Sequence, residues 1–224
     1  MKSKCKLFNV PIHGFIYIPD PIDFQLVNLP CFQRLKPIAQ LGLTYLVYPG
    51  AHHTRFHHTL GAYHLMQKSI EALRSKGINI TSAEQQAACR AILLHDIGHG
   101  PFSHALEKHI VPHVNHEQLS IKLMRFFNKK HDGALQMALD MFTNRHPKTF
   151  LNSLISSQLD VDRLDFLKRD SFFTGVSEGV INADRLISML NVVDGKLVME
   201  QKAIYSVEKF IFSRRLMYWQ VYYH

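Results

Sequence analysis

The sequence has few cysteines, no long hydrophobic run and no low-complexity linker. Its three cysteines (Cys5, Cys31 and Cys89) are widely spaced and form no C-x-x-C pair, so we expect a reducing compartment and no disulfide framework. No segment approaches the roughly 18 apolar residues of a membrane span, and the basic N-terminus lacks the uninterrupted apolar stretch of a secretory signal. These absences indicate a cytoplasmic protein with no membrane partner.

The composition is that of a folded, basic protein. With 224 residues, of which 46% are hydrophobic and 20% charged, the chain is long enough for one sizeable core and too apolar to be disordered. Lys and Arg number 26 against 18 for Asp and Glu, which gives a formal net charge of +8. This excess favours an anionic partner, such as nucleic acid, a nucleotide or an acidic surface, without choosing among them.

Helical periodicity dominates the hydrophobic pattern. Thr54 can cap a helix that runs to about residue 75, and Gly77 is suited to end it. Thr81 and Glu84 form a capping box ahead of a second helix, which ends at His95-Asp96. Further helical stretches are expected at residues 24–41 with proline interruptions, at 116–129, 133–144 and 148–170, and from about 206 to the end of the chain.

A few short segments favour β structure instead. Residues 7–20 and 45–48 contain β-prone runs that end at prolines. Asp194-Gly195 is a two-residue turn between aliphatic flanks, which is a strong signal for a β-hairpin. The fold class expected from these patterns is mainly α, with a short β-hairpin near 191–204 and minor N-terminal β structure.

Histidine is unusually abundant and unevenly distributed. Nine of the fifteen histidines fall between His52 and His109, which indicates a site rather than a scatter. His95-Asp96 follows the apolar run 91–94, so the pair emerges from a buried helix. Burying an imidazole and a carboxylate without partners is costly, and a metal ion would offset that cost. Mixed His/Asp ligation suits Mn, Fe, Zn, Ni or Mg.

Each of these pieces also has an ordinary structural interpretation. A lone His-Asp dipeptide is usually coincidental, and His57 and His58 alone would more often be surface or capping residues. The acidic run 160–165 could form a solvated helix face with i,i+4 pairs such as Asp165–Arg169. The metal-site interpretation gains weight because the pieces occur together and in order.

That order resembles a known superfamily. His58, then His95-Asp96, then Asp162 is the H…HD…D order of the HD-domain metal-dependent phosphohydrolases. The string H-D-I-G-H-G-P-F-S-H at residues 95–104 resembles one branch of it, the deoxynucleoside triphosphate triphosphohydrolases. The resemblance runs from about residue 7 to the end of the chain. It implies an HD-domain helical bundle, and we expect residues 1–224 to be a single such core that lacks its C-terminal continuation.

The resemblance also implies roles for individual residues. It implies His58, His95, Asp96 and Asp162 as metal ligands, His104 with Glu107 as an acid–base dyad, and His116 as a further catalytic histidine. It also implies Arg55 and Arg163 as phosphate contacts, Gln40, Leu41 and Asp170 near the sugar, and Arg214 and Tyr222 completing the nucleotide pocket. The i,i+3 spacing of His104 and Glu107 is compatible with the dyad, because a carboxylate one turn away can orient an imidazole.

The activity implied by the resemblance is metal-assisted hydrolysis of a deoxynucleoside triphosphate into deoxynucleoside and triphosphate. A divalent metal ion is the expected cofactor, a nucleoside triphosphate the expected substrate, and a homo-oligomer the expected assembly. One alternative is an HD-type phosphodiesterase or nuclease, since the basic charge also suits nucleic acid. The HD-x-GK and GYP motifs of the cyclic-dinucleotide branch are absent. Another alternative is a non-catalytic nucleotide- or nucleic-acid-binding module.

Overall fold

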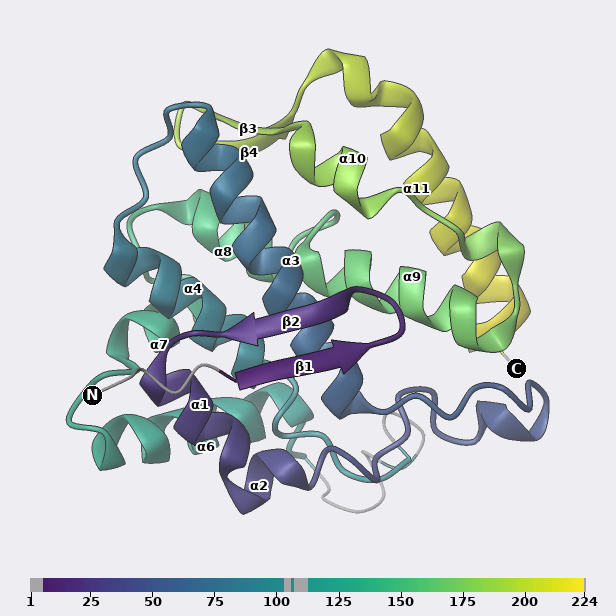
Figure 1. Cartoon of the computed structure of the whole chain (residues 1–224), viewed down its shortest axis with the longest axis horizontal. Helices are drawn as coiled ribbons and strands as arrows, with labels where there is room; N and C mark the ends of the chain where they lie inside the picture. Colours follow the sequence, from purple (N-terminus) through teal and green to yellow (C-terminus); the bar gives the residue numbers. More distant parts are fainter. Residues whose placement is uncertain (1–5, 103–105, 107–112, 224) are drawn as a thin grey trace.

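Three helices form the centre of the structure, a computed structural model that describes residues 6–102, 106 and 113–223. They are α3 (Arg55–Ser75), α4 (Ser82–Leu94) and α9 (Val161–Thr174), and α3 contacts both of the others. All three contribute fully buried leucines to the core. The prediction of a mainly α fold is confirmed (Figure 1).

The boundaries of these central helices follow local sequence signals. In the capping box of α4, Thr81 Oγ1 accepts from Glu84 N at 3.2 Å, and Glu84 Oε2 accepts from Thr81 N at 2.8 Å. Gly77 follows α3 with φ +82°, a conformation that glycine adopts without strain. These caps fix where α3 ends and where α4 begins.

The remaining helical elements surround this centre. Two of them begin with proline at the first helical position, where the missing N–H is tolerated. They are α1 (Pro21–Asn28), α2 (Pro30–Gln33), α6 (His116–Lys130), α7 (Gln136–Phe142), α8 (Thr149–Ile155), α10 (Ala183–Ser188) and α11 (Ile204–Met217), with the 3₁₀ turns η1 (Thr44–Leu46), η2 (Ser177–Gly179) and η3 (Gln201–Ala203) and the π-helical turn η4 (Tyr218–Tyr222).

Three of the predicted elements differ from the structure. The helical stretch expected at 24–41 begins at Pro21 and ends at Gln33, and residues 34–41 form turns and an isolated bridge. The helix expected at 148–170 is split into α8 and α9, because Asp160 caps the second helix by accepting from Arg163 N at 2.8 Å and from Ser157 N at 2.7 Å. The β-prone run at 45–48 is part of a 3₁₀ turn instead. Thr44 stabilises that turn by donating its hydroxyl to the Leu41 carbonyl at 2.8 Å.

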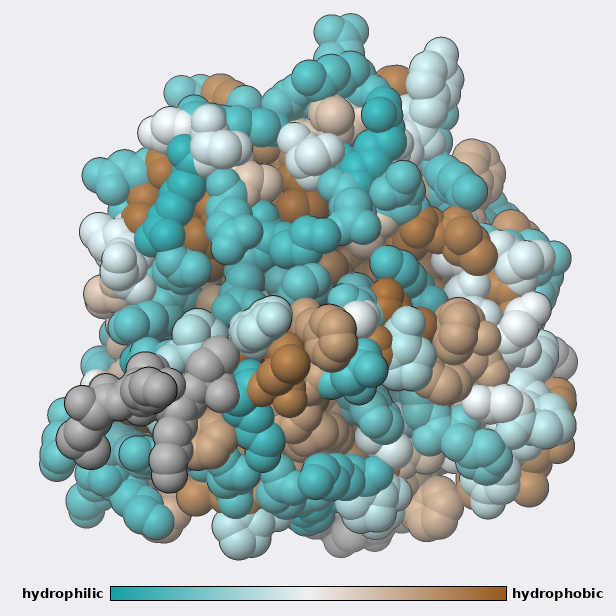
Figure 2. All heavy atoms as spheres, viewed as in Figure 1, coloured by the Kyte–Doolittle hydropathy of each residue, from teal (hydrophilic) through white to brown (hydrophobic). Residues whose placement is uncertain are grey.

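Both predicted β regions are present as two-stranded antiparallel hairpins. β3 (Leu190–Val193) and β4 (Lys196–Met199) are joined by Asp194-Gly195, both with positive φ. β1 (Lys6–Val10) and β2 (Gly14–Ile18) are joined by a three-residue loop, and β2 contacts α3. Hydrophobic side chains gather over this first hairpin (Figure 2). Among its residues, Leu7, Phe15 and Tyr17 are exposed.

The last helical segment has two unlike faces. Four residues of α11 and η4 are buried, while Tyr205 and Trp219 are 81% and 56% exposed. The segment therefore has one face in the core and one apolar, aromatic face exposed at the surface. Within the described part of the chain, no helix is both long and apolar enough to span a bilayer.

Candidate metal centre

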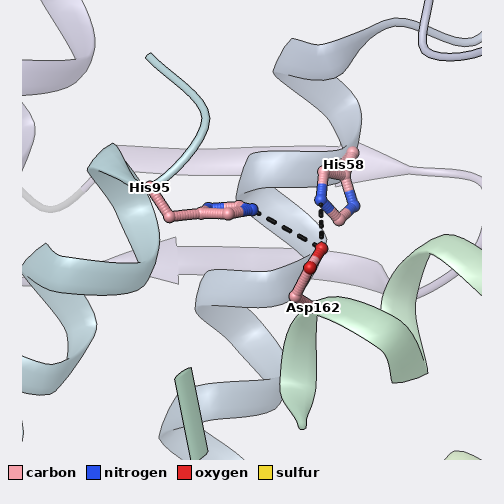
Figure 3. A group of neighbouring side chains, drawn as sticks. All are labelled: His58, His95 and Asp162. Atoms are coloured by element: carbon pink, nitrogen blue, oxygen red, sulfur yellow. Dashed lines mark ion pairs between the residues drawn. The ribbon is translucent and has the colours of Figure 1, made fainter. Parts of the chain in front are cut away.

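Three side chains from three central helical segments converge on one point (Figure 3). His58 lies in the first turn of α3, His95 caps the C-terminus of α4, and Asp162 lies in the first turn of α9. Asp162 Oδ1 is 2.9 Å from His58 Nε2 and 3.5 Å from His95 Nε2. The segments that supply these groups are separated by up to a hundred residues of sequence, and helix packing brings them together.

Hydrogen bonds at Nδ1 of His58 and His95 determine that the lone pair of each neutral ring is on Nε2. His58 Nδ1 lies 2.8 Å from Asp165 Oδ2, and His95 Nδ1 lies 2.6 Å from the Ile92 carbonyl oxygen. Because a carbonyl and a carboxylate can only accept, each Nδ1 donates, and in the neutral imidazole Nε2 carries the lone pair. Both Nε2 atoms are buried and lack a hydrogen-bond partner among the described residues.

This donor set fits a divalent metal ion. When His58 is neutral, its Nε2 faces a carboxylate oxygen at 2.9 Å and two lone pairs oppose each other, which either a proton on Nε2 or a metal ion beside both atoms relieves. Two imidazoles and carboxylates are ligands that Zn, Fe, Mn and Ni accept. The outer hydrogen bonds to Asp165 and Ile92 are of the kind that orients metal-bound histidines.

Asp96 connects this cluster to a second group of potential ligands. Its Oδ2 accepts from Arg55 Nη1 at 2.5 Å, and its Oδ1 lies 3.4 Å from Nε2 of both His95 and His99. Asp96, His99 and His116 have ligand-type atoms within 4.8 Å of one another, and the rings of the two histidines stack at 3.8 Å. Asp96 is therefore placed between two sets of imidazoles.

The electrostatics favour positive charge at the centre. Burial lowers the pKa of His58, but the carboxylates of Asp162 and Asp165 outweigh burial and raise the pKa to about 10. Burial raises the pKa of Asp162, yet His58 and His95 hold it below its usual range. His99 differs, because burial lowers its pKa to about 4 despite the neighbouring Asp96. Positive charge is thus stabilised at His58, whereas a proton is disfavoured at His99, which stays a neutral imidazole.

A cavity of about 620 Å³ opens beside the cluster. A volume of this size is typical of small-molecule sites. Among the predicted site residues, its lining includes Gln40, Leu41, Arg55, Asp96, His116, Asp162, Asp170 and Tyr222.

Part of the cavity wall is a buried hydrogen-bond network around Asp170. Asp170 Oδ2 accepts from the Tyr222 hydroxyl at 2.8 Å, and Oδ1 lies 2.6 Å from His53 Nε2. The His53 ring stacks on Phe173 with centroids 4.7 Å apart. Oε1 of Gln40, another lining residue, is buried and has no hydrogen-bond partner among the described residues. These groups offer a ligand both a fixed carboxylate and an unfilled acceptor.

Two predicted site residues lie away from the cavity, and two others fall outside the residues that the structure describes. Arg163 pairs with Asp160, and Arg214 Nη1 lies 3.3 Å from Gln158 Oε1; neither arginine lines the cavity. His104 and Glu107 fall outside the described residues, so the acid–base dyad stays a prediction.

Residue spacing gave no indication of Arg34 and Ser120, which hold the turn after His95-Asp96. Arg34 donates from both terminal nitrogens, to the carbonyls of Ile97 and His99 at 2.7 Å each. Ser120 Oγ accepts from Gly98 N at 2.9 Å and donates to the His95 carbonyl at 2.7 Å. Both residues come from other helical segments, so only the folded chain reveals them.

The acidic run of α9 also differs from its solvated interpretation. Asp165 and Arg169 do form the i,i+4 pair, with bonds of 2.9 Å from Nε and Nη2, but both side chains are completely buried. A buried, bidentate pair of this kind requires further donors on the carboxylate. Asp165 finds one of them in His58, which makes the pair part of the site.

Comparisons with known proteins identify the family. The HD domain matches residues 55–169, and the HD-associated region matches residues 181–224. The chain is 35% identical to the uncharacterized protein YwfO of Bacillus subtilis, over 99% of this chain and 52% of that protein. It is 32% identical to the deoxynucleoside triphosphate triphosphohydrolase SAMHD1 homolog of Dictyostelium discoideum, over 100% of this chain and 47% of that protein.

The solved structures agree. The crystal structure of a phosphohydrolase from Bacteroides thetaiotaomicron matches with a TM-score of 0.96 and 54% sequence identity, covering 99% of this chain and 55% of that one. The chain belongs to the HD-domain family and carries an HD-associated region. It spans about half the length of the relatives that it matches.

Proposed function

We propose that the chain is a metal-dependent phosphohydrolase that cleaves deoxynucleoside triphosphates into deoxynucleoside and triphosphate. The observation that carries this proposal is the convergence of two imidazole lone pairs and a carboxylate at the wall of a nucleotide-sized cavity. The likeness to the Dictyostelium triphosphohydrolase homolog supports the choice of substrate.

The proposed metal ligands are His58, His95, Asp96 and Asp162. Mn, Fe, Zn, Ni and Mg all fit a mixed set of imidazoles and carboxylates. When bound, such an ion supplies Lewis-acid polarisation of a phosphate oxygen and a lower pKa for water. The chain contributes the fixed orientation of these ligands, since Asp165 and Ile92 hold the two imidazole rings.

We propose that Arg55 binds the phosphates. It is the first residue of α3, its guanidinium contacts Asp96, and it lines the cavity. A planar guanidinium matches phosphate oxygens with two parallel donors. The net charge of +8 suits a substrate that carries several negative charges. Arg55 would thus hold the polyphosphate beside the metal ligands.

The proposed reaction needs proton carriers near the α-phosphorus. The oxygen of water bonds to phosphorus and water gives up a proton, the bond from phosphorus to the 5′-oxygen breaks, and the 5′-oxygen gains a proton. We propose that His116 moves that proton, which is supported by its place in the cavity lining and its stacking on His99. We propose His104 with Glu107 as the accompanying dyad. Gln40, Leu41, Asp170 and Tyr222 would contact the sugar and base.

The test incubates the chain with each deoxynucleoside triphosphate and Mn²⁺ or Mg²⁺ and identifies the products by chromatography. Deoxynucleoside with intact triphosphate is the expected result. Released inorganic phosphate, or cleaved nucleic acid with untouched triphosphates, would overturn the proposal and favour a different HD chemistry. Asp162→Ala should abolish both activity and metal binding, while Glu208→Ala, at an exposed position on α11, should change neither.

A further inference from the structure

His13 reaches the metal centre from outside the matched HD segment. It ends the three-residue loop between β1 and β2, before Gly14, whose φ of +68° allows the tight turn. The side chain of His13 is only 4% exposed, and its Nε2 lies 2.7 Å from Asp165 Oδ1. The turn thus places a buried imidazole against a carboxylate that lies 152 positions further along the chain.

Asp165 receives four hydrogen bonds from described residues. Oδ1 accepts from His13 Nε2 at 2.7 Å and from Arg169 Nη2 at 2.9 Å. Oδ2 accepts from His58 Nδ1 at 2.8 Å and from Arg169 Nε at 2.9 Å. A carboxylate offers about four lone-pair positions, so these donors fill it and fix its orientation. His13 and His58 hold opposite oxygens of the same group.

The carboxylate also packs closely against the backbone of α3. A Cβ atom added at Gly61 would lie 1.9 Å from Asp165 Oδ1 and 2.3 Å from Arg169 Nη2. The buried pair therefore presses directly on the backbone of α3, one turn after His58. Any rotation of the carboxylate is transmitted to the hydrogen bond that orients His58, because the same atoms make both contacts.

We propose that His13 is a positioning residue for the metal site, acting through Asp165 on the metal ligand His58. This inference rests on the metal site of the proposed function. Loss of the His13 donor leaves a buried carboxylate lone pair unfilled, which costs free energy until the carboxylate turns or takes up water. Either response loosens the bond that keeps His58 Nε2 directed at the metal.

The test is a titration of the chain with Co²⁺ alone, monitored by the visible absorption of the bound Co²⁺. This signal reports both the affinity and the coordination geometry. His13→Leu removes the donor and should weaken Co²⁺ binding about tenfold, the lower end of the effect of outer-sphere partners, and should change the spectrum. His13→Gln keeps an N–H donor at a similar reach and should restore binding to within about threefold of wild type. His64→Leu is the matched control, since its ring lies 5.4 Å from that of His13 but is not one of the four donors to Asp165.

Thermal unfolding of the metal-free variants separates positioning from stability. If His13→Leu does not fold, His13→Asn, whose shorter amide cannot reach Asp165, takes its place. Unchanged Co²⁺ affinity and spectrum in a folded His13 variant would overturn the inference, as would equal losses in His64→Leu or no metal binding by the wild type. Metal binding that responds to His13 in a chain without nucleotide hydrolysis would contradict the proposed function and leave this inference standing.

Discussion

Nη1 of Arg34 donates to the carbonyl of His99 at 2.7 Å, and Nη2 of the same side chain donates to the carbonyl of Ile97, two residues earlier. A single guanidinium therefore grips the turn that follows the His-Asp pair. The turn also packs tightly against the start of α6, since a Cβ added at Gly98 would lie 2.1 Å from the His116 carbonyl oxygen. The position of His99 beside Asp96 depends on a residue of the N-terminal segment.

Replacing Arg34 should therefore reduce activity more than stability. Arg34→Lys keeps the charge but cannot bridge two carbonyls, and we expect kcat to fall at least about tenfold with a loss of about 1–2 kcal/mol in unfolding free energy. Steady-state kinetics and urea denaturation measure the two effects. Arg125→Lys on the exposed side of α6 is the control, and equal behaviour of both variants would contradict the prediction.

The buried Asp165 should make stability depend on acid pH. Burial raises the pKa of Asp165, but Arg169, His13 and His58 outweigh burial and hold it well below its usual range. Because the folded-state pKa is below the unfolded value of about 3.9, the ionised group stabilises the fold at neutral pH, and this contribution is lost as the pH falls below about 4. Urea denaturation between pH 7 and pH 3 measures the slope.

Asp165→Asn should remove that part of the slope and destabilise the chain by about 3–5 kcal/mol, since it leaves Arg169 as a buried charge without its partner. Failure to fold at pH 7 would agree with this loss. A variant as stable as wild type at pH 7, with the same pH slope, would show that the buried pair has no such role.

Gly61 should tolerate no side chain. Gly61→Ala places a methyl group within 1.9 Å of Asp165 Oδ1, and we expect a loss of more than about 3 kcal/mol together with weaker metal binding. The matched control is Gly77→Ala, which meets open space and should lose only about 1–2 kcal/mol through its left-handed backbone. Comparable losses in the two variants would contradict the predicted clash.

Metal affinity should fall as the pH falls. The carboxylates raise the pKa of His58 and His95 above the usual histidine value, and both imidazoles must lose a proton before Nε2 can bind a metal. We expect the Kd for Mn²⁺ to rise about tenfold per unit decrease in pH for each proton released. Isothermal titration between pH 6 and pH 8 measures it, and a constant Kd would exclude these nitrogens as ligands.

Tyr222 should contribute to substrate binding through Asp170. Burial raises the pKa of the Tyr222 phenol well above its usual value, so the hydroxyl stays protonated and donates to Asp170. Tyr222→Phe removes the donor from a buried carboxylate and should lower kcat/KM by about tenfold without changing metal content. Tyr223→Phe, at a residue 68% exposed, serves as the control. Equal kinetics in both variants would separate Tyr222 from the site.

The sequence predicted what local chemistry determines. Thr54 and Gly77 marked α3, Asp194-Gly195 marked the second hairpin, and the H…HD…D order selected residues that converge. The helix prediction failed at Asp160 because this residue caps a new helix after an interruption between α8 and α9, and the hydrophobic pattern does not show that interruption.

The supports of the site could not be found in this way. His13 and Arg34 touch the site across 152 and 65 positions of sequence, and no spacing rule links a residue on a hairpin turn, or one just after a short helix, to a distant helix end. Their roles arise from packing between elements, which one sequence without its fold does not specify.

The matched HD segment begins at Arg55, after both of these supports. Recombination that exchanged only residues 55–169 between relatives would transfer the four candidate ligands. It would leave behind His13, which donates to Asp165, and Arg34, which donates to the turn after His95-Asp96. Such chimaeras should inherit the motif without its metal affinity unless the N-terminal hairpin and α2 are exchanged with it. The unit that is inherited as a working centre is therefore longer than the unit recognised by its motif.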